Sequence, residues 1–178
     1  MEETTKKLWE KCVAFHGHSC PGLATGFQAA RYAIELLELT DRSGDEEVVC
    51  VTENDACGVD AIQVILGCTA GKGNLIFDLQ GKMAFSFYRR DTGKSIRLVL
   101  RPTPALDRQA KLKLLTEGDC HDFFDVKAAP EPLPEPARIL RSCTCSLCGE
   151  QMAETHAHLQ DGKIVCDRCW KPYRRGSR

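Results

Sequence analysis

The sequence predicts an α+β fold, in which a mainly antiparallel sheet is flanked by helices, followed by a small C-terminal treble-clef zinc finger. Three observations predict it. Helices and strands are segregated after residue 70, which is typical of α+β rather than doubly wound α/β proteins. Four prolines crowd the segment 128–137, and pairs of cysteines follow it. The chain has 178 residues, which suits one ordinary domain and a small module.

Helical patterns and one short strand occupy the first part of the chain. The first helix is predicted over 5–15, and a second begins at Pro21, because proline is favoured at the first helical position. An apolar run predicts a buried strand over 48–52. A third helix is predicted over 58–66, closed by Gly67. The second helix carries a core-facing stripe at helical spacing, formed by Leu23, Phe27, Ala30, Ile34 and Leu37.

Alternating apolar residues over 75–102 predict a three-stranded antiparallel meander. Its turns are expected at Gln80-Gly81 and Thr92-Gly93, because glycine accepts the backbone conformations of tight hairpins. A last core helix is predicted over 105–117, with Gly118 as its stop. The core therefore ends its regular structure near residue 127.

The domain prediction is an α+β core at 1–127, a proline-rich linker at 128–137 and a zinc finger at 138–178. Prolines at every second position favour extended polyproline II and cannot join a sheet interior. The charge is also divided, with −3 on the core and +4 on the last segment, although the whole chain carries −1. The linker is thus expected to act as a semi-rigid spacer.

The compartment prediction is cytoplasmic. The sequence has no apolar run of the roughly 18 residues that a membrane span needs. Its N-terminus is too charged for a secretory signal. In a reducing compartment the 11 cysteines are expected to be metal ligands, reactive thiols or buried small residues rather than disulfides.

The C-terminal cysteines have the spacing of a structural zinc site. Two CxxC pairs, Cys145/Cys148 and Cys166/Cys169, present four thiolates for a tetrahedral Zn²⁺. A segment this short buries too little apolar surface to fold alone, and zinc would supply roughly 10–16 kcal/mol. Cys143 in place of Cys145 and a rubredoxin-like iron site are the alternatives. A hairpin at 157–165 turning at Asp161-Gly162, then a short helix after Cys169, would complete the treble clef.

A basic zinc finger also raises the question of nucleic acid. Four of the last eight residues are basic, but such a cluster is usually a solvated tail. His156 and His158 between the two pairs are expected on an exposed hairpin strand. Nucleic-acid binding is therefore not expected, and a protein partner is favoured.

The segment FHGHSCPG places His16, His18 and Cys20 at alternate positions before a helix-opening proline. Residues before proline are biased to extended backbone, in which alternate side chains share a side. We therefore expect these three side chains to converge, either as metal ligands or as a catalytic cluster. Cys20 also lies at the mouth of a helix, where the dipole favours a thiolate.

Cys57 is a candidate partner for this group. It follows a strand and opens a helix, and a metal site including His18, Cys20 and Cys57 is predicted, with a tight strand–helix junction as the structural alternative. GCTAGKGN fails the spacing of a phosphate loop, although Lys72 in its flexible backbone remains a candidate anion contact. The cluster in GDCHDFF, residues 118–124, is interpreted as structural.

These motifs together resemble one family. FHGHSCPGLATGFQAA, DACGVDAIQ, GCTAGKGN and FSFYRR are similar to the E-subunit family of formylmethanofuran dehydrogenase over about residues 8–125, and the cysteine pairs resemble its auxiliary treble-clef finger. The resemblance implies a homodimer through the core and an anaerobic setting linked to a molybdenum- or tungsten-dependent enzyme. It also implies a cleft lined by His16, His18, Cys20, Cys57 and Lys72.

Three functions follow as expectations. The first is a metal-binding accessory subunit, or a stand-alone relative of one, with oxidoreductase subunits as partners. The redox step is not expected from this chain alone, because nothing in it resembles a molybdopterin-binding or iron–sulfur-rich subunit. The second is a small metal- or cysteine-dependent enzyme acting on an acyl or one-carbon substrate. The third is a regulatory protein whose finger binds nucleic acid.

Overall fold

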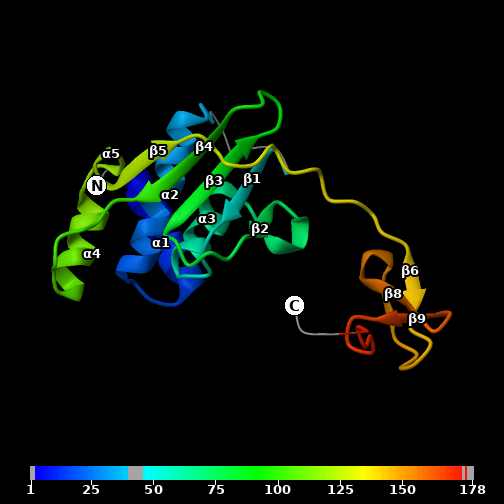
Figure 1. The fold of residues 1–178 in the computed structure, drawn as a ribbon. Coiled ribbons are helices and arrows are strands. Elements are labelled where there is room, and N and C mark those ends of the chain that lie inside the picture. Colours follow the sequence, from blue (N-terminus) through cyan, green and yellow to red (C-terminus); the bar gives the residue numbers. More distant parts are fainter. Residues whose placement is uncertain (1–2, 40–45, 174, 176–178) are drawn as a thin grey trace. The chain divides into compact units, whose positions relative to one another are not determined.

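The computed structural model describes residues 3–39, 46–173 and 175. The chain divides into two compact units, residues 1–137 and 138–178, and each is described by itself (Figure 1). The mixture of helices and strands confirms the predicted α+β class. The first unit contains, in chain order, α1 (Glu3–His16), α2 (Pro21–Leu36), β1 (Val48–Thr52), α3 (Gly58–Leu66), the 3-10 helix η1 (Ala70–Lys72), β2 (Leu75–Phe77), β3 (Ala84–Arg89), β4 (Ser95–Leu100), α4 (Arg108–Glu117), α5 (Cys120–Phe123) and β5 (Phe124–Lys127).

Local signals set most of these boundaries. α2 begins at Pro21 as predicted, and α3 covers the predicted range, with Gly67 in the left-handed conformation at its C-cap. α4 begins later than expected, at Arg108, because the Asp107 carboxylate caps the helix by accepting from the Ala110 N–H at 2.9 Å. Within the described ranges, none of the helices is long and apolar enough to cross a membrane.

The sheet has five strands in the order β2-β1-β3-β4-β5. Its strands pair antiparallel except β2, which runs parallel to β1, with Cys50 opposite Leu75. The predicted three-stranded meander is therefore wrong at its first strand. β1, α3 and β2 form a crossover unit, which places β2 on the outer edge of β1 instead of beside β3. The turn glycines Gly81 and Gly93 both have positive φ, as their hairpin roles require.

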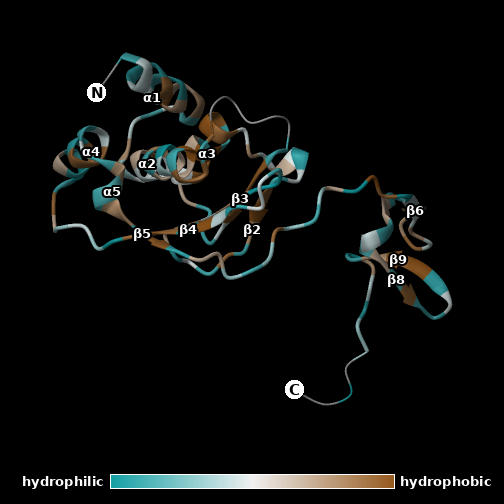
Figure 2. Cartoon of the chain, turned by 90° about the horizontal axis from the view of Figure 1, so that it is seen from above, coloured by the Kyte–Doolittle hydropathy of each residue, from teal (hydrophilic) through white to brown (hydrophobic). Residues whose placement is uncertain are grey.

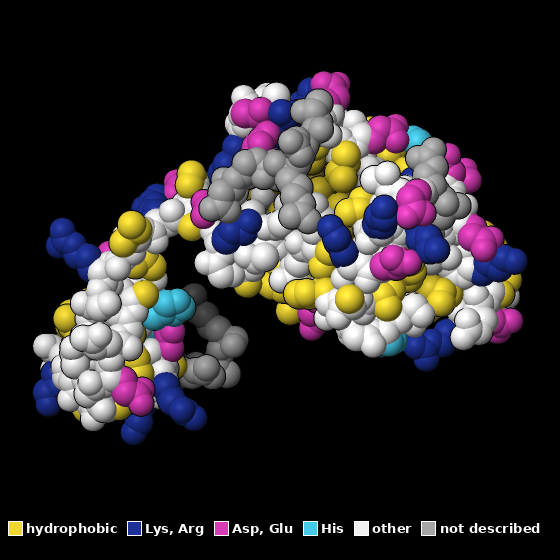
Figure 3. Space-filling view, turned by 180° about the vertical axis from the view of Figure 1, so that it is seen from behind, with side chains coloured by type: hydrophobic (Ala, Val, Ile, Leu, Met, Phe, Trp, Pro, Cys, Tyr) yellow, Lys and Arg dark blue, Asp and Glu magenta, His cyan; other side chains and the backbone are white. Residues whose placement is uncertain are grey.

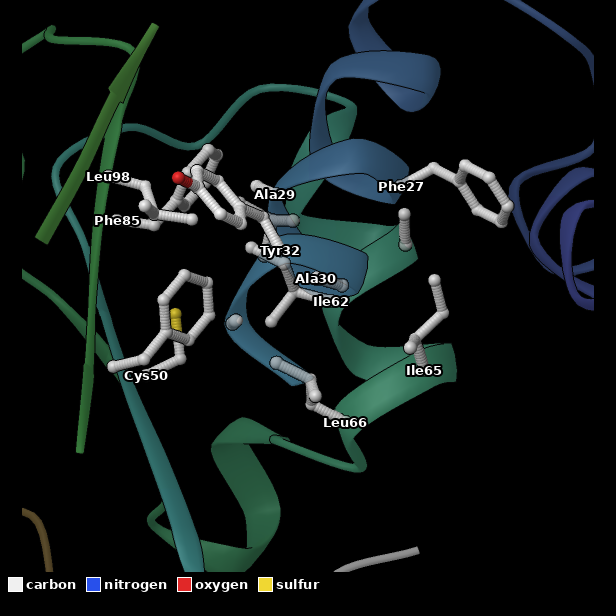
Figure 4. Packing of buried hydrophobic residues seen from close by; sticks show 14 of the residues in the cluster. Phe27, Ala29, Ala30, Tyr32, Cys50, Ile62, Ile65, Leu66, Phe85 and Leu98 are labelled. Carbon is white, nitrogen blue, oxygen red and sulfur yellow. The ribbon is translucent and has the colours of Figure 1, made fainter. Parts of the chain in front are cut away.

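The core lies between one face of the sheet and the helices α2 and α3. α2 is buried over most of its length, and the rings of Phe85 and Phe87 on β3 are fully buried. Figure 4 shows Ile62 and Leu66 of α3 among the same packed side chains. Colouring by hydropathy places the most hydrophobic residues on the inner strands and on the inner helices (Figure 2). α1 covers α2 through Trp9, whose ring meets Phe27 edge-on at 5.3 Å.

The proline-rich segment follows the other face of the sheet. Tyr88 on β3 is 2% exposed although it points away from the helices, and its hydroxyl donates to the Glu131 carbonyl at 3.1 Å. The Arg90 guanidinium donates to the Pro134 carbonyl at 2.7 Å. Residues 128–137 thus belong to the first compact unit, because their carbonyls are bound by side chains of the sheet.

The second unit is built from two hairpins. β6 (Ser142–Thr144) pairs with β7 (Gln151–Ala153), and β8 (Ala157–Gln160) pairs with β9 (Lys163–Cys166) after the short helix η2 (Glu154–His156). The second hairpin turns at Asp161-Gly162 as predicted, with positive φ at both residues. The short helix expected after Cys169 is not found in 170–173. Residues 174 and 176–178 lie outside the described residues.

Candidate functional site

His16 and Cys20 stand at the facing ends of two helices. α1 ends at His16, and the chain reverses at Gly17, whose φ of 90° is in the region that favours glycine. Cys20 has extended backbone and caps α2, with its sulfur accepting from the Leu23 N–H at 3.3 Å. The expected continuous extended segment is therefore wrong, because His16 is still helical. A helix end and a glycine turn, rather than strand-like alternation, orient the three side chains.

The three side chains nevertheless converge. The ligand atoms of His16, His18 and Cys20 all lie within 4.8 Å of one another. The imidazole rings of His16 and His18 are 4.6 Å apart, and His16 Nε2 lies 3.8 Å from Cys20 Sγ. Cys20 is 6% exposed and His18 is exposed, so the group lies between the protein interior and solvent.

Asp60 completes this group. Its carboxylate contacts His16 Nδ1 at 2.7 Å from the first turn of α3. The contact leaves Nε2 of His16 directed toward Cys20, as a carboxylate does for metal-binding or catalytic histidines. Sequence reasoning assigned Asp60 no role, because 44 residues separate it from His16. Its one local signal is an acidic residue in the first turn of a helix that opens after Cys57.

Cys57 lies across Gly22 from Cys20. A Cβ added at Gly22 would stand 3.6 Å from Cys57 Sγ and 3.9 Å from Cys20 Sγ. Burial, followed by a hydrogen bond with Cys20, raises the pKa of Cys57. The thiolate expected at Cys57 from the helix mouth is therefore not favoured. The structure groups His16, rather than Cys57, with His18 and Cys20 in the candidate ligand set.

Lys72 is not brought to this group. Its Nζ would stand 3.6 Å from a Cβ at Gly67, beyond the C-terminal end of α3. Cys57 and Asp60 lie at the other end of that helix, and nine helical residues span about 13 Å. The expectation that Lys72 shares a cleft with His16 and Cys20 is thus not met within one chain. The α3 crossover carries the lysine away.

The second unit holds a compact group of four cysteines. The sulfurs of Cys145, Cys148, Cys166 and Cys169 all lie within 4.8 Å of one another. Backbone N–H donors, that of Cys148 first and that of Cys166 next, lower the pKa of Cys145 to about 6. The hydrogen bond with Cys166 raises the pKa of Cys169 to about 12. Four sulfurs this close, one of them poised as a thiolate, fit a metal such as Zn²⁺.

A polar cluster supports the second knuckle. Asp167 contacts His156 Nδ1 at 2.6 Å and His158 Nε2 at 2.5 Å, and both histidines lower the pKa of Asp167, His158 more strongly. His158 is stacked on Trp170, with ring centroids 4.0 Å apart. These contacts tie the β8–β9 hairpin to the residues that follow Cys166. They belong to the scaffold of the four-cysteine group.

Comparison with known proteins places the core. Residues 15–124 match the family described as "FmdE, Molybdenum formylmethanofuran dehydrogenase operon". The chain belongs to the FmdE family. The match includes His16, His18, Cys20, Cys57 and Asp60, whereas the four-cysteine group lies outside it.

Two relatives extend the FmdE comparison. A curated protein of Archaeoglobus fulgidus, "Probable S-adenosyl-L-methionine-binding protein", is 28% identical over 199 aligned residues. That alignment covers 94% of this chain and 53% of the relative, so the chain spans about half of the relative's length. A crystal structure of an FmdE-like protein of tungsten formylmethanofuran dehydrogenase, from Syntrophus aciditrophicus, has a TM-score of 0.66 at 22% identity. The match covers 93% of this chain and 91% of that one, and it supports the fold.

Proposed function

We propose that this chain is a metal-binding accessory subunit, or a stand-alone relative of one, of a molybdenum or tungsten formylmethanofuran dehydrogenase. The convergence of His16, His18 and Cys20 within 4.8 Å is the observation that carries the proposal. Membership in the FmdE family supplies the enzyme system. In this role the chain binds a metal or a substrate group, and the redox step takes place on another subunit.

The donor set suits a transition metal. Imidazole nitrogens and a cysteine sulfur are preferred ligands of Zn²⁺ and its neighbours. The Asp60 carboxylate holds His16 Nδ1 and so leaves Nε2 for the ion, an arrangement common around metal-binding histidines. Three protein ligands leave a fourth position for water or substrate, where a bound divalent ion would supply Lewis-acid chemistry.

The zinc finger is proposed to dock a partner subunit or a second copy of the chain. Its net charge of +4 contrasts with the acidic core. On the face seen in Figure 3, basic side chains are interspersed with acidic and hydrophobic ones, which does not favour a nucleic-acid surface. Exposed large apolar side chains, typical of protein contact surfaces, are Ile139, Leu147, Leu159, Ile164 and Tyr173.

Elemental analysis of the purified full chain tests the metal proposal. Under anaerobic, reducing conditions we expect wild type to hold one more equivalent of metal than Cys20→Ser or His18→Ala, with unchanged circular dichroism. Asp60→Asn should weaken affinity about 10–100-fold, since it removes the group that orients His16. Competition against a chromophoric chelator measures that affinity. Asp55→Asn, exposed on the same loop, is the matched control and should bind as wild type does.

The finger supplies an internal reference for this count. Cys166→Ser should lose the metal of the four-cysteine group while keeping that of the core. If Cys20→Ser and His18→Ala retain the full metal content of wild type, the core proposal is wrong.

A second candidate is a small enzyme with Cys20 as nucleophile. The line from Asp60 through His16 to Cys20 favours it, because His16 is held at Nδ1 and faces the sulfur with Nε2. The Cys20 sulfur would attack an acyl carbon while its proton passes to His16. His16 then gives that proton to the leaving group as the thioester forms, and water hydrolyses the thioester and restores the thiol.

Acylation in the presence of a chelator separates this enzyme from the metal proposal. An activated acyl ester should modify Cys20 in metal-free protein, as located by peptide mass spectrometry. His16→Ala should slow the modification about 100-fold or more, the usual contribution of a general base. His18→Ala should not, because His18 is outside the line. Equal rates in all three proteins would remove the nucleophile proposal without affecting the metal one.

A further inference from the structure

We propose that Glu35, Cys120 and His121 form a separate transition-metal site on the core, where α2 meets α5. The site uses no residue of the His16–His18–Cys20 group or of the four-cysteine group. It offers one carboxylate, one thiol and one imidazole, a donor set that suits Zn²⁺. The sequence alone interpreted GDCHDFF as structural, and Glu35 is far from it in the chain.

The three donor atoms already face one another. Their ligand atoms lie within 4.8 Å of one another, and His121 Nε2 is 2.8 Å from Glu35 Oε1. Tetrahedral zinc separates neighbouring N, O and S ligands by about 3.3 to 3.8 Å, from its usual bond lengths. Glu35 and His121 are both exposed, so small side-chain rotations can open their contact to admit an ion. The position opposite the protein would be left for water.

Asp119 orients the imidazole. Its carboxylate contacts His121 Nδ1, so Nε2 is directed at Glu35. A histidine that binds metal through one nitrogen commonly gives the other to a carboxylate, and this contact supplies that second partner. The same carboxylate caps α5 by accepting from the His121 N–H at 3.1 Å. The ring orientation is therefore fixed by the fold.

The backbone around the cluster is also held. The buried Gln28 side chain on α2 donates to the carbonyls of Leu115 and Gly118, which ties α2 to the chain that leads into α5. The Tyr32 ring meets His121 edge-on with centroids 4.7 Å apart. The Arg101 guanidinium donates to the His121 carbonyl at 3.1 Å. These contacts preorganise donors that come from two separate helices.

Cys120 supplies the least exposed donor. It is 5% exposed, and its sulfur lies 3.9 Å from His121 Nδ1. Burial raises the pKa of this thiol to about 11, so a bound cation must displace its proton, as metals do at cysteine ligands generally. Two carboxylates beside the thiol give the site the negative charge that attracts a divalent ion.

Cobalt binding by the full-length protein tests the site, because Co²⁺ bound to cysteine gives a sulfur-to-metal charge-transfer band. We expect wild type at saturation to bind one more equivalent than His121→Ala, Cys120→Ser or Glu35→Gln. The difference spectrum of wild type against Glu35→Gln, which retains Cys120, should change in its ligand-field region. Glu38→Gln is the matched control, since Glu38 is exposed beside the end of α2 and pairs with Lys94 instead. Its metal content should equal that of wild type.

An alternative without metal uses the same contacts. There His121 is a cation between Glu35 and Asp119, whose hydrogen bonds raise its pKa and clasp α2 to α5. In that case His121→Gln and Glu35→Gln lower thermal stability but leave the cobalt count and spectrum unchanged, and the proposed site is rejected. Melting each variant with and without cobalt separates a misfolded variant from one that folds and has lost the ion.

Discussion

Glu53 is a buried carboxylate at the end of β1, joined to Arg97 of β4 by two contacts. The Arg97 Nε and Nη2 atoms lie 2.6 and 2.9 Å from the two carboxylate oxygens, and the Glu53 side chain is only 6% exposed. The pair borders a cavity of about 270 Å³ that Lys82 and Lys127 also line. Removing the acid would leave a partly buried guanidinium among other cations. This residue pair therefore holds two strands and a local charge balance together.

Glu53→Gln should lower the free energy of unfolding at neutral pH by about 3 kcal/mol, the lower end for breaking a buried pair. The hydrogen bond from Arg97 holds the Glu53 pKa below its ordinary value of about 4.3. The carboxylate thus stabilises the fold above that value, and its contribution disappears as pH falls through the lower native pKa. Urea unfolding across this pH range should show the wild-type and variant curves converging in acid.

The exposed pair Arg101–Asp125 is the control for this comparison. Its side chains are about half exposed, so Asp125→Asn should change stability by no more than about 1 kcal/mol. A Glu53→Gln curve that stays parallel to wild type down to acid pH would show that Glu53 is not the titrating group.

At the scale of elements, the position of the candidate site depends on how closely α2 approaches α3. A Cβ at Gly26 would overlap the backbone carbonyl of Gly58, and a Cβ at Gly58 would stand 3.0 Å from the Gly26 nitrogen. The two helices are in backbone contact at this crossing. Their N-terminal ends carry Cys20 on one side and Asp60 on the other, so the contact sets the distance between them.

Gly26→Ala should therefore destabilise the core by about 3 kcal/mol or more, because the added methyl group meets rigid backbone rather than a side chain. It should also weaken metal binding at the His16 group by separating Asp60 from His16. Gly71→Ala is the control, since nothing lies within 4 Å of its Cβ position, and a change below about 1 kcal/mol is expected. Thermal melts and metal titrations of both variants measure these effects. Equal stability of the two would contradict the close crossing.

The elements also show how far sequence reasoning reaches. Pro21 at a helix start, Gly67 at a helix end and glycine at the hairpin turns are local signals, and the structure follows them. Long-range pairing is not local. The parallel placement of β2 depends on where the α3 crossover returns the chain, and the same return takes Lys72 away from Cys57. The sequence could predict that His16, His18 and Cys20 meet, but not that Asp60 meets them.

At the scale of the whole molecule, the proline-rich segment is part of the core's covering. Helices α2 and α3 cover one face of the sheet, and the opposite face includes Val49 and Tyr88, which pair across β1 and β3. Both are buried, and the Glu131 carbonyl accepts from the Tyr88 hydroxyl. Proline suits this task, because an extended chain that lacks N–H groups can lie on a sheet face without adding unpaired donors.

A chain ending at Lys127 should consequently be less stable than one ending at Ala137, although both lack the finger. Exposing a valine or an aromatic side chain costs about 1.5 to 3 kcal/mol each, so a loss of about 2 to 4 kcal/mol is expected from Val49 and Tyr88. Urea unfolding of the two truncated chains measures the difference. Full-length Tyr88→Phe isolates the hydroxyl bond to Glu131 and should cost about 1 kcal/mol. If both truncated chains unfold at the same urea concentration, the segment is a spacer that touches the sheet without supporting it. If the shorter chain is the weaker one, the folded core extends through the prolines to residue 137.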